Sequence, residues 1–486
     1  MPDHPQFPQD DALVYLNHAG VGVWPRHTRD TVHRFAETCL RRGAADYPDW
    51  IEVESRLRER LARLMDVPAE DVALVPNTSA GLSIIAYGLD WQPGDEIITN
   101  DQEFPSNRWV WESLAQRYGV RVRQVRLGDA ATPEDALIEA LGPRTRLLPV
   151  SSVQYGTGLR MDLERLSNAC REHGVLLGVD AIQTLGALQL SVDADFIVAD
   201  GHKWLLGPEG IGALYCRPEL RRRLRLTQFG WHMVDRLGEF DRPDWQPADS
   251  GRCFEPGSPN LLGSHALEAS LAVLEETGMA EVERRVLANA RYTMEAARSH
   301  GCELVTPQEP DRHAGIVTFR VPGADPERLL AALRGSDVAC AARCGGIRFS
   351  PHFYTSYEAI DEGWRRLRYC LEGGGPLRAA ASSRKMASAA RRPLRGCSRP
   401  RRCSLMRRKA WWRRSAEPPA ASCCASPAGS RPRSGAPWLC RSKSARIAAT
   451  PSASSTGACS QPSASLTGSP PAARRNTSVS PRIWTV

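Results

Sequence analysis

The chain has 486 residues, of which 42% are hydrophobic and 24% are charged, and its formal net charge is +8. This length allows a sizeable core and predicts roughly two to four domains. No apolar run is long enough to span a bilayer and the 14 cysteines show no Cys-x-x-Cys spacing, so the sequence predicts no membrane anchor, no disulfide scaffold and no metal site.

The first part of the chain alternates between helical periodicity and short apolar runs. Residues Met1–Gln6 lack the pattern of a secretory signal, so we expect a cytoplasmic protein. Helices are predicted at Glu52–Met65 and at Trp109–Tyr118, and a third begins at Thr132, with Pro133 in its first position. Strands are predicted at the following apolar runs: Val72–Val75, Leu147–Ser152, Val175–Val179 and Phe196–Ala199. Strands that alternate with helices indicate a mostly parallel sheet covered on both faces.

The pattern changes after about Ser264, where long helices precede short strands. The expected elements are helices at His265–Thr277 and Met279–His300 and strands at Ile316–Val321 and Val338–Ala341. A capping box at Thr355–Glu358 predicts a last helix that ends at Leu371. We expect a smaller α+β domain that packs over the edge of the large sheet. The predicted division is an N-terminal segment (1–20), a large domain (21–263), a small domain (264–372) and a tail (373–486).

The tail differs sharply in composition from the rest. From Pro376 to Val486 there are 22 Lys and Arg residues and a single acid, Glu417, whereas the preceding part is net negative. Such a segment cannot bury enough apolar surface to fold, so we predict that it is disordered. Three explanations compete: a basic arm that binds nucleic acid non-specifically, a linker with a partner motif, and out-of-frame translation. We favour the last, because acids vanish while Trp, Cys and Arg occur at irregular positions.

Two consecutive predicted strands end in residues that carry chemistry. Asp180 follows one strand directly, and Lys203 lies just beyond the next in a Gly-His-Lys context. The carboxyl ends of parallel strands meet at one edge of a sheet, where ligands bind. A partly desolvated lysine there suits Schiff-base chemistry, and a carboxylate suits the pyridine nitrogen of pyridoxal phosphate. Taken singly, Asp180 fits a helix N-cap and Lys203 a surface lysine; the pair favours the cofactor.

These residues and their context resemble the class V aminotransferase family of fold type I enzymes that depend on pyridoxal phosphate (PLP). This family includes cysteine desulfurases and isopenicillin N epimerase-like proteins, and the resemblance covers about Tyr15–Leu371. It implies an α/β large domain with a smaller C-terminal domain. It also implies that Lys203 binds the cofactor and serves as the catalytic base, that Asp180 holds the pyridine nitrogen, that Gln183 bonds the phenolic oxygen and that His202 helps to hold the phosphate.

Two further segments resemble phosphate-binding parts of the family. A helix opens within Pro76–Gly81, and the first N–H groups of a helix bind anions, although an ordinary helix cap has the same pattern. The N–H groups in question belong to Thr78, Ser79 and Ala80. The segment Phe254–Asn260 resembles a loop that reaches the phosphate in the neighbouring subunit through Ser258, and it also fits a plain turn. The resemblance therefore implies a homodimer.

The segment Ala342–Tyr354 resembles the one whose arginine binds the substrate carboxylate. Arg343 matches that position best, and a guanidinium binds a carboxylate in bidentate fashion; a surface salt bridge is the alternative. One desulfurase subgroup has a nucleophilic cysteine five positions later, where this chain has Arg348. Cys344 lies four residues too early for that role, and a small buried or neutral thiol suits it better.

Two other positions depart from the family pattern. Pro105 replaces a histidine that desulfurases stack on the cofactor ring, which leaves Phe104 or Trp109 to cover it, and Asp200 replaces a common serine near the phosphate. The missing cysteine and histidine argue against an enzyme-bound persulfide. We therefore expect an aminotransferase-like enzyme acting on an amino acid or amine. The alternatives are a cysteine desulfurase or C–S lyase, then an amino-acid epimerase, and, in a different class, a nucleic-acid-binding protein.

Overall fold

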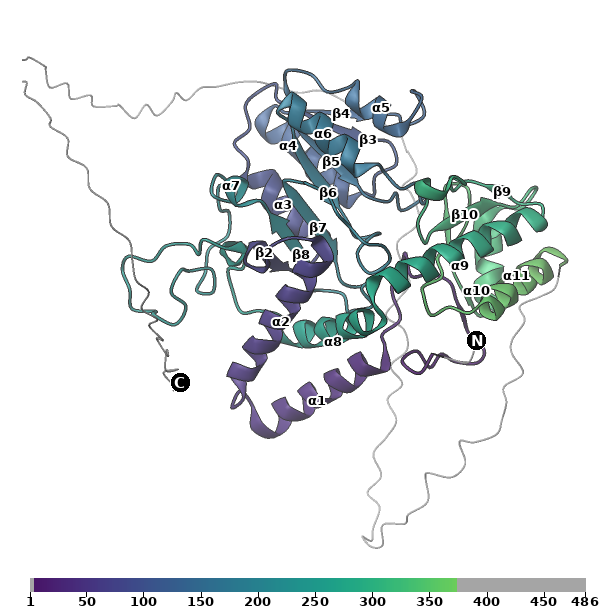
Figure 1. The fold of residues 1–486 in the computed structure, drawn as a ribbon, viewed down its shortest axis with the longest axis horizontal. Helices are drawn as coiled ribbons and strands as arrows, with labels where there is room; N and C mark the ends of the chain where they lie inside the picture. The colour runs from purple at the N-terminus through teal and green to yellow at the C-terminus, as the bar shows by residue number, and fades with distance from the viewer. Residues whose placement is uncertain (1–3, 374–486) are drawn as a thin grey trace, which may run out of the picture. The chain divides into compact units, whose positions relative to one another are not determined.

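A seven-stranded sheet forms the larger part of the computed structural model, which describes residues 4–373 (Figure 1). In spatial order its strands are β2 (Val72–Val75), β8 (Gly212–Cys216), β7 (Phe196–Asp200), β6 (Leu176–Asp180), β5 (Thr145–Ser151), β3 (Glu96–Asn100) and β4 (Arg121–Val125). Neighbouring strands are parallel except at β8, which is antiparallel to β2 and to β7. The predicted mostly parallel sheet is confirmed. The predicted tail, with its three explanations, lies outside the described residues.

Apolar layers lie on both faces of this sheet, because successive residues of a strand point to opposite faces. Leu147 and Leu148 of β5 belong to different apolar clusters, and so do Ile197 and Val198 of β7. One face is covered by α3 (Thr78–Gly88) and α4 (Ser106–Tyr118), and the other by α2 (Tyr47–Met65), α5 (Pro133–Ile138), α6 (Leu163–His173) and α8 (Leu261–Thr277). We call the sheet with these helices the large lobe.

Local capping signals fixed several of these helix ends as the sequence predicted. Gly119, with φ of 68°, ends α4, and Thr132 forms a capping box with Asp135 at the start of α5. Helix α1 (Arg26–Arg42) packs with α2 along α8. The short elements are α7 (Pro218–Arg221), η1 (Ala69–Asp71), η2 (Gly251–Phe254) and η3 (Pro310–Arg312). The division into domains stays a prediction, and its boundary at residue 263 lies within α8.

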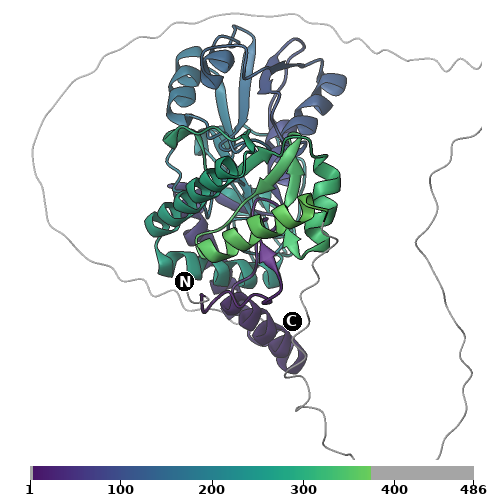
Figure 2. The ribbon, with the colours of Figure 1, turned by 90° about the vertical axis from the view of Figure 1, so that its right-hand side faces the viewer.

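A four-stranded antiparallel sheet forms the small lobe (Figure 2). Its strands are β12 (Ala341–Arg343), β13 (Gly346–Phe349), β10 (Val317–Arg320) and β9 (Glu303–Leu304), and its helices are α9 (Met279–Ser299), α10 (Pro326–Gly335) and α11 (Tyr357–Leu371). Phe319, Phe349 and Trp364 are in contact at its core. The N-terminal strand β1 (Val14–Tyr15) pairs with β11 (Val338–Ala339), so the start of the chain is attached to this lobe.

The capping box predicted at Thr355–Glu358 is wrong by one residue. Ser356 is the N-cap of α11 and accepts the N–H of Ala359 at 3.2 Å. The hydroxyl of Thr355 instead accepts the N–H of His352 at 3.0 Å, which closes the preceding turn. Two adjacent hydroxyl residues make the cap ambiguous in sequence. Within residues 4–373, no helix is both long and apolar enough to cross a membrane.

Candidate active site

Asp180 and Lys203 lie at the carboxyl ends of the adjacent parallel strands β6 and β7. Both are buried, with 3% and 9% of their surfaces exposed, and Asp180 accepts the N–H of Ile182 at 3.1 Å. Burial raises the pKa of Asp180 and lowers the pKa of Lys203, because each charged form loses its hydration. A lysine with a lowered pKa has a larger neutral fraction, which is the form that acts as nucleophile or base.

The backbone of Lys203 is held by the N-terminal segment. The N–H of Gly22 donates to the carbonyl of His202 at 2.7 Å. A Cβ on Gly22 would lie 2.1 Å from the carbonyl oxygen of Lys203, a distance at which the backbone must move. Only glycine therefore allows this segment to lie directly against the backbone of Lys203.

The side chains of Gln183 and His352 hold Trp204, the residue after the lysine. Its indole N–H donates to Gln183 Oε1 at 2.8 Å, and the amide of Gln183 donates to the carbonyl of Ala19 at 3.2 Å. His352 Nε2 donates to the carbonyl of Trp204 at 3.0 Å. The amide nitrogen of Gln183 keeps one N–H beyond these bonds, and its predicted bond to the phenolic oxygen of the cofactor stays a prediction.

The start of α3 offers polar groups that fit a phosphate. The side chain of Asn77 caps the helix and already accepts the N–H of Ala80 at 2.9 Å, so the N–H groups of Thr78 and Ser79 are the open ones. Among the described residues, the buried Thr78 Oγ1 has no hydrogen-bond partner, and the same holds for His202 Nδ1 and Asp200 Oδ1. The hydroxyl of Thr78 and the imidazole of His202 can donate to a bound phosphate group, whereas the carboxylate oxygen of Asp200 cannot.

Asp200, the acid that replaces a common serine, lies beside His202. Its Oδ1 is 3.1 Å from His202 Nδ1, without the alignment of a hydrogen bond. Ser258 and Ala80 both line a cavity with a volume of about 970 Å³, which is also bounded by Pro76 and Asn260. The predicted contact of Ser258 with a neighbouring subunit stays a prediction.

Phe104, of the two aromatic candidates, lies next to the lysine. Its ring centroid is 5.6 Å from Lys203 Nζ, whereas Trp109 is 60% exposed and carries Arg108 over its ring.

The neighbouring Glu103 was not predicted as a site residue. Its buried carboxylate accepts hydrogen bonds from Asn100, Asn107, Ser151 and Gln154. It thereby fixes the turn that carries Phe104, and a lone acid between a strand and a helix gave no sequence signal for this role.

Arg343 and Arg348 of the small lobe lie close enough to Lys203 to influence its pKa. Arg343 is exposed on β12 and donates to the carbonyl of Ala342, whereas Arg348 on β13 is 2% exposed and donates to the carbonyl of Tyr155 at 2.7 Å. Arg348 Nε has no partner among the residues described here. Both positive charges contribute to the lowered pKa of Lys203, after burial. The sequence favoured Arg343 and missed Arg348. A charged residue between the apolar residues Ile347 and Phe349 is the signal that could have marked it.

Cys344 occupies a two-residue hairpin turn between β12 and β13 and is exposed, so the prediction of a buried residue there is wrong, although its thiol is partly covered. Its φ of 50° and the φ of 72° at Gly345 are typical of a type I′ turn. Its sulfur is close to Gly156, where a Cβ would approach it to 2.6 Å. Burial raises the pKa of Cys344, so the protonated thiol, a poor nucleophile, is favoured.

Comparison with known proteins agrees with this geometry. The family model for class-V aminotransferases matches residues 49–362. The chain belongs to the class V aminotransferase family. It is 31% identical over 383 residues to isopenicillin N epimerase of Streptomyces clavuligerus, covering 72% of this chain and 93% of the relative. It is 27% identical over 322 residues to a probable cysteine desulfurase of Pyrococcus abyssi, covering 63% of this chain and 80% of that relative.

Solved structures of the same family have the same fold. The cystine C–S lyase C-DES, in complex with its reaction product cysteine persulfide, superposes with a TM-score of 0.69 at 25% identity, over 73% of this chain and 97% of that one. The cysteine desulfurase CsdA of Escherichia coli gives 0.68 at 25% identity, over 76% and 97%. The protein is therefore a PLP-dependent enzyme of fold type I, as its sequence predicted.

The raised pKa of Asp180 predicts how the stability of the cofactor-free protein depends on pH. The folded chain holds a proton on Asp180 up to about pH 7, whereas the unfolded chain releases this proton near pH 4. As the pH rises between these values, deprotonation favours the unfolded chain, so the free energy of unfolding falls. In urea unfolding, wild type should lose stability between pH 5 and pH 7 relative to Asp180→Asn. The exposed Asp49→Asn variant is the control and should follow wild type. A parallel pH dependence of Asp180→Asn and wild type would contradict the raised pKa.

The contact at Gly22 predicts a second outcome. Gly22→Ala should cost about 1–3 kcal/mol of stability by overpacking, and it should weaken cofactor retention because the lysine backbone is displaced. Thermal unfolding and the cofactor content after gel filtration measure both effects. Gly128→Ala is the matched control, because a Cβ there meets nothing within 4 Å. Equal cofactor content in both variants would show that the lysine does not depend on this contact.

Proposed function

We propose that this enzyme binds an α-amino acid by its carboxylate and moves the α-proton with Lys203, in an aminotransferase-like reaction. The observation that carries the proposal is the buried Arg348, which lies close enough to Lys203 to help lower the pKa of that lysine. A buried guanidinium with an unpartnered Nε suits a carboxylate ligand. Arg343, the residue predicted from sequence, is proposed to assist from the exposed end of the same hairpin.

The other residues have separate proposed roles around the cofactor. Bound PLP supplies an electron sink that stabilises negative charge at the substrate α-carbon. Lys203 holds the cofactor and, once free, is the base that accepts the α-proton. Asp180 would hold the pyridine nitrogen and Gln183 would bond the phenolic oxygen. The phosphate would be held by Thr78, Ser79 and His202, together with Ser258, which we propose acts across a homodimer interface. The N–H of Ala80, predicted to help, is already bonded to Asn77.

Phe104, whose ring lies beside Lys203, favours proton movement by a single base, because it offers no second one. Phe104 carries no titratable group, and Pro105 stands where desulfurases have a histidine. A lysine that both removes and returns the proton suits transamination, in which the proton moves between two carbons on one side of the substrate. Inversion at the α-carbon needs a second proton donor, so we place epimerase activity last.

A C–S lyase acting on a sulfur amino acid is the second candidate. The likeness to the cystine C–S lyase C-DES favours it. The protonated thiol of Cys344 argues against a desulfurase that carries the sulfur on the enzyme, whereas a lyase releases its product without such a thiol. We also propose a cytoplasmic location, and we assign nucleic-acid binding no part in the activity.

The visible absorption of the purified protein tests the cofactor and the role of Lys203. Wild type should show a band of lysine-bound PLP that Lys203→Ala lacks, and one member of a panel of amino acids should shift or bleach it. The product then identifies the reaction: a keto acid formed with an amino acceptor indicates transamination, and pyruvate with a reduced sulfur species indicates a C–S lyase. A band that is identical in Lys203→Ala would contradict the proposed role of the lysine.

The two arginines make a second test. With the amino acid identified above, Arg348→Lys should raise KM at least about tenfold, because an ammonium cannot replace a bidentate guanidinium, while Arg343→Lys should change KM less. The corresponding amine without a carboxylate should react equally slowly with wild type and with Arg348→Lys. If Arg348→Lys slowed the reaction of the amine as much as that of the amino acid, Arg348 would act on the structure of the lobe and not on the carboxylate.

A further inference from the structure

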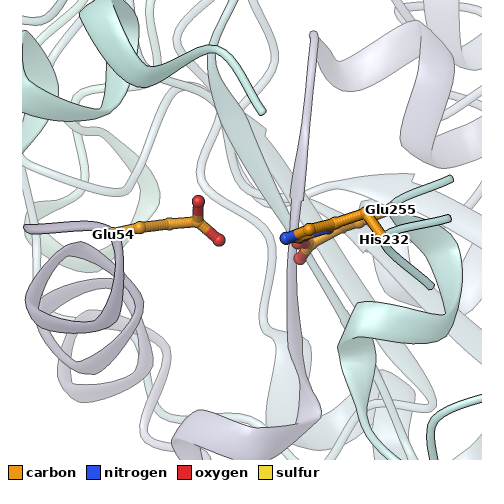
Figure 3. Close-up of side chains that lie close together, drawn as sticks. All are labelled: Glu54, His232 and Glu255. Carbon is orange, nitrogen blue, oxygen red and sulfur yellow. Dashed lines mark ion pairs between the residues drawn. The ribbon is translucent and has the colours of Figure 1, made fainter. Parts of the chain in front are cut away.

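Three buried side chains outside the cofactor region converge on one point (Figure 3). Glu54 comes from α2, His232 from the segment between α7 and η2, and Glu255 from the residue after η2. One potential ligand atom of each lies within 4.8 Å of the other two, and His232 Nδ1 is 3.7 Å from Glu255 Oε2. The three residues are only 5%, 3% and 7% exposed.

Two of these ligand atoms lack a partner. Glu54 Oε2 and His232 Nδ1 are buried and make no hydrogen bond to any residue that the structure describes. Leaving a buried polar atom without a partner is unfavourable, and native proteins usually satisfy such atoms. Figure 3 shows the carboxylate of Glu54 directed across a gap toward His232 and Glu255. The unpartnered atoms therefore point to a ligand between them.

Neighbouring groups hold the carboxylates by their other oxygens. Arg58 donates to Glu54 Oε1 at 2.9 Å and to Glu255 Oε1 at 2.6 Å, and the N–H of Leu74 donates to the same oxygen of Glu255. A longer bond of 3.2 Å joins Arg58 to Glu255 Oε2. Metal ligands in proteins are commonly oriented in this way by an outer layer of hydrogen bonds. This arrangement leaves Oε2 of each glutamate toward the histidine.

We propose that Glu54, His232 and Glu255 bind one divalent transition-metal ion of the zinc class, with a fourth position open to the adjacent cavity. An imidazole nitrogen with two carboxylates suits zinc, and not the oxygen-only preference of Mg²⁺ or Ca²⁺. Tetrahedral zinc with bonds of about 2.1 Å separates its ligands by about 3.4 Å, close to the 3.7 Å between His232 and Glu255.

The groups around this site indicate which fourth ligand would complete the coordination of the metal ion. His232 and Glu255 line the cavity of about 970 Å³, so water or hydroxide has access to the fourth position. Arg58 offsets part of the charge of the two glutamates, and Arg252 donates to the carbonyl of His232 at 2.7 Å. With this positive charge nearby, an anionic fourth ligand such as hydroxide is favoured.

A metal here would join α2 to the loop that carries Ser258, three residues after Glu255. Its role is therefore structural: it would fix the loop that lines one side of the cavity next to the start of α3. The site is separate from Lys203 and Asp180 and does not depend on the proposed reaction. Its sequence gives no signal, because the three ligands are far apart in the chain and lie in no metal-binding motif.

Titration with Co²⁺ tests the site in the full-length protein loaded with PLP, after treatment with a chelator and removal of free cofactor. We expect one equivalent to bind with visible bands of nitrogen and oxygen ligation, and we expect Zn²⁺ to displace it. Glu54→Gln and His232→Asn should each lose at least about tenfold in affinity. Glu268→Gln on α8, which breaks ion pairs with Arg56 and Arg60 outside the site, is the matched control and should bind like wild type.

Thermal unfolding supplies a second readout. Zn²⁺ should raise the unfolding temperature of wild type and of Glu268→Gln but not of the two site variants, whose metal-free values show whether they are folded. The wild-type spectrum is decisive even if a variant does not fold. Absence of bound Co²⁺, or a spectrum of thiolate ligation only, would overturn the site, as would equal affinity in all four proteins.

Discussion

A lysine and an aspartate are buried together at the ends of two neighbouring parallel strands, and the residues around them are arranged to hold this pair. Parallel strands β6 and β7 bring Asp180 and Lys203 to one edge of the sheet, and apolar layers on both faces exclude water from them. Without water, each charge is disfavoured, so the lysine is more readily neutral and the aspartate more readily protonated. A cofactor with a ring nitrogen and an aldehyde satisfies both groups at once.

The small lobe and the N-terminal segment hold this edge in place through two neutral histidines. His352 donates to the carbonyl of Trp204, and His18 donates to the carbonyl of Ser350 at 2.9 Å and accepts the hydroxyl of Tyr354 at 2.6 Å. A carbonyl oxygen only accepts, so each histidine carries its proton on the nitrogen that faces it. Burial lowers the pKa of His18 to about 4, which keeps it neutral. The lysine thus rests on contacts from residues that are distant in the chain.

The candidate site is built from both lobes. The large lobe supplies the lysine, the aspartate and the helix start proposed to bind phosphate, while the small lobe supplies Arg348. Arg348 donates to the carbonyl of Tyr155, in the loop after β5, so its position depends on how the lobes pack. The cluster at Glu54, His232 and Glu255 brings together distant segments of the large lobe in a similar way. The positions of Arg348 and of this cluster are therefore both set by long-range contacts.

Local patterns in the sequence determined most of the fold. Apolar runs, capping residues and turn glycines marked the strands, and the ends of helices such as α4, because these signals depend on near neighbours. The paired strand ends made Asp180 and Lys203 recognisable, and a family resemblance supplied the remaining cofactor residues. The start of α11 was misplaced by one residue, because Thr355 and Ser356 offer equal caps until the tertiary contact with His352 selects one.

Only the tertiary structure decided which residues surround the lysine. The choice of Phe104 over Trp109, the burial of Arg348, the bonding of Glu103 and the convergence of Glu54 with Glu255 all join positions that are separated in the chain. No periodicity or spacing encodes such contacts, because they arise when the packing of apolar layers brings distant segments together. The sequence by itself determined the chemistry at the strand ends, and the packing decided the shape of the site around it.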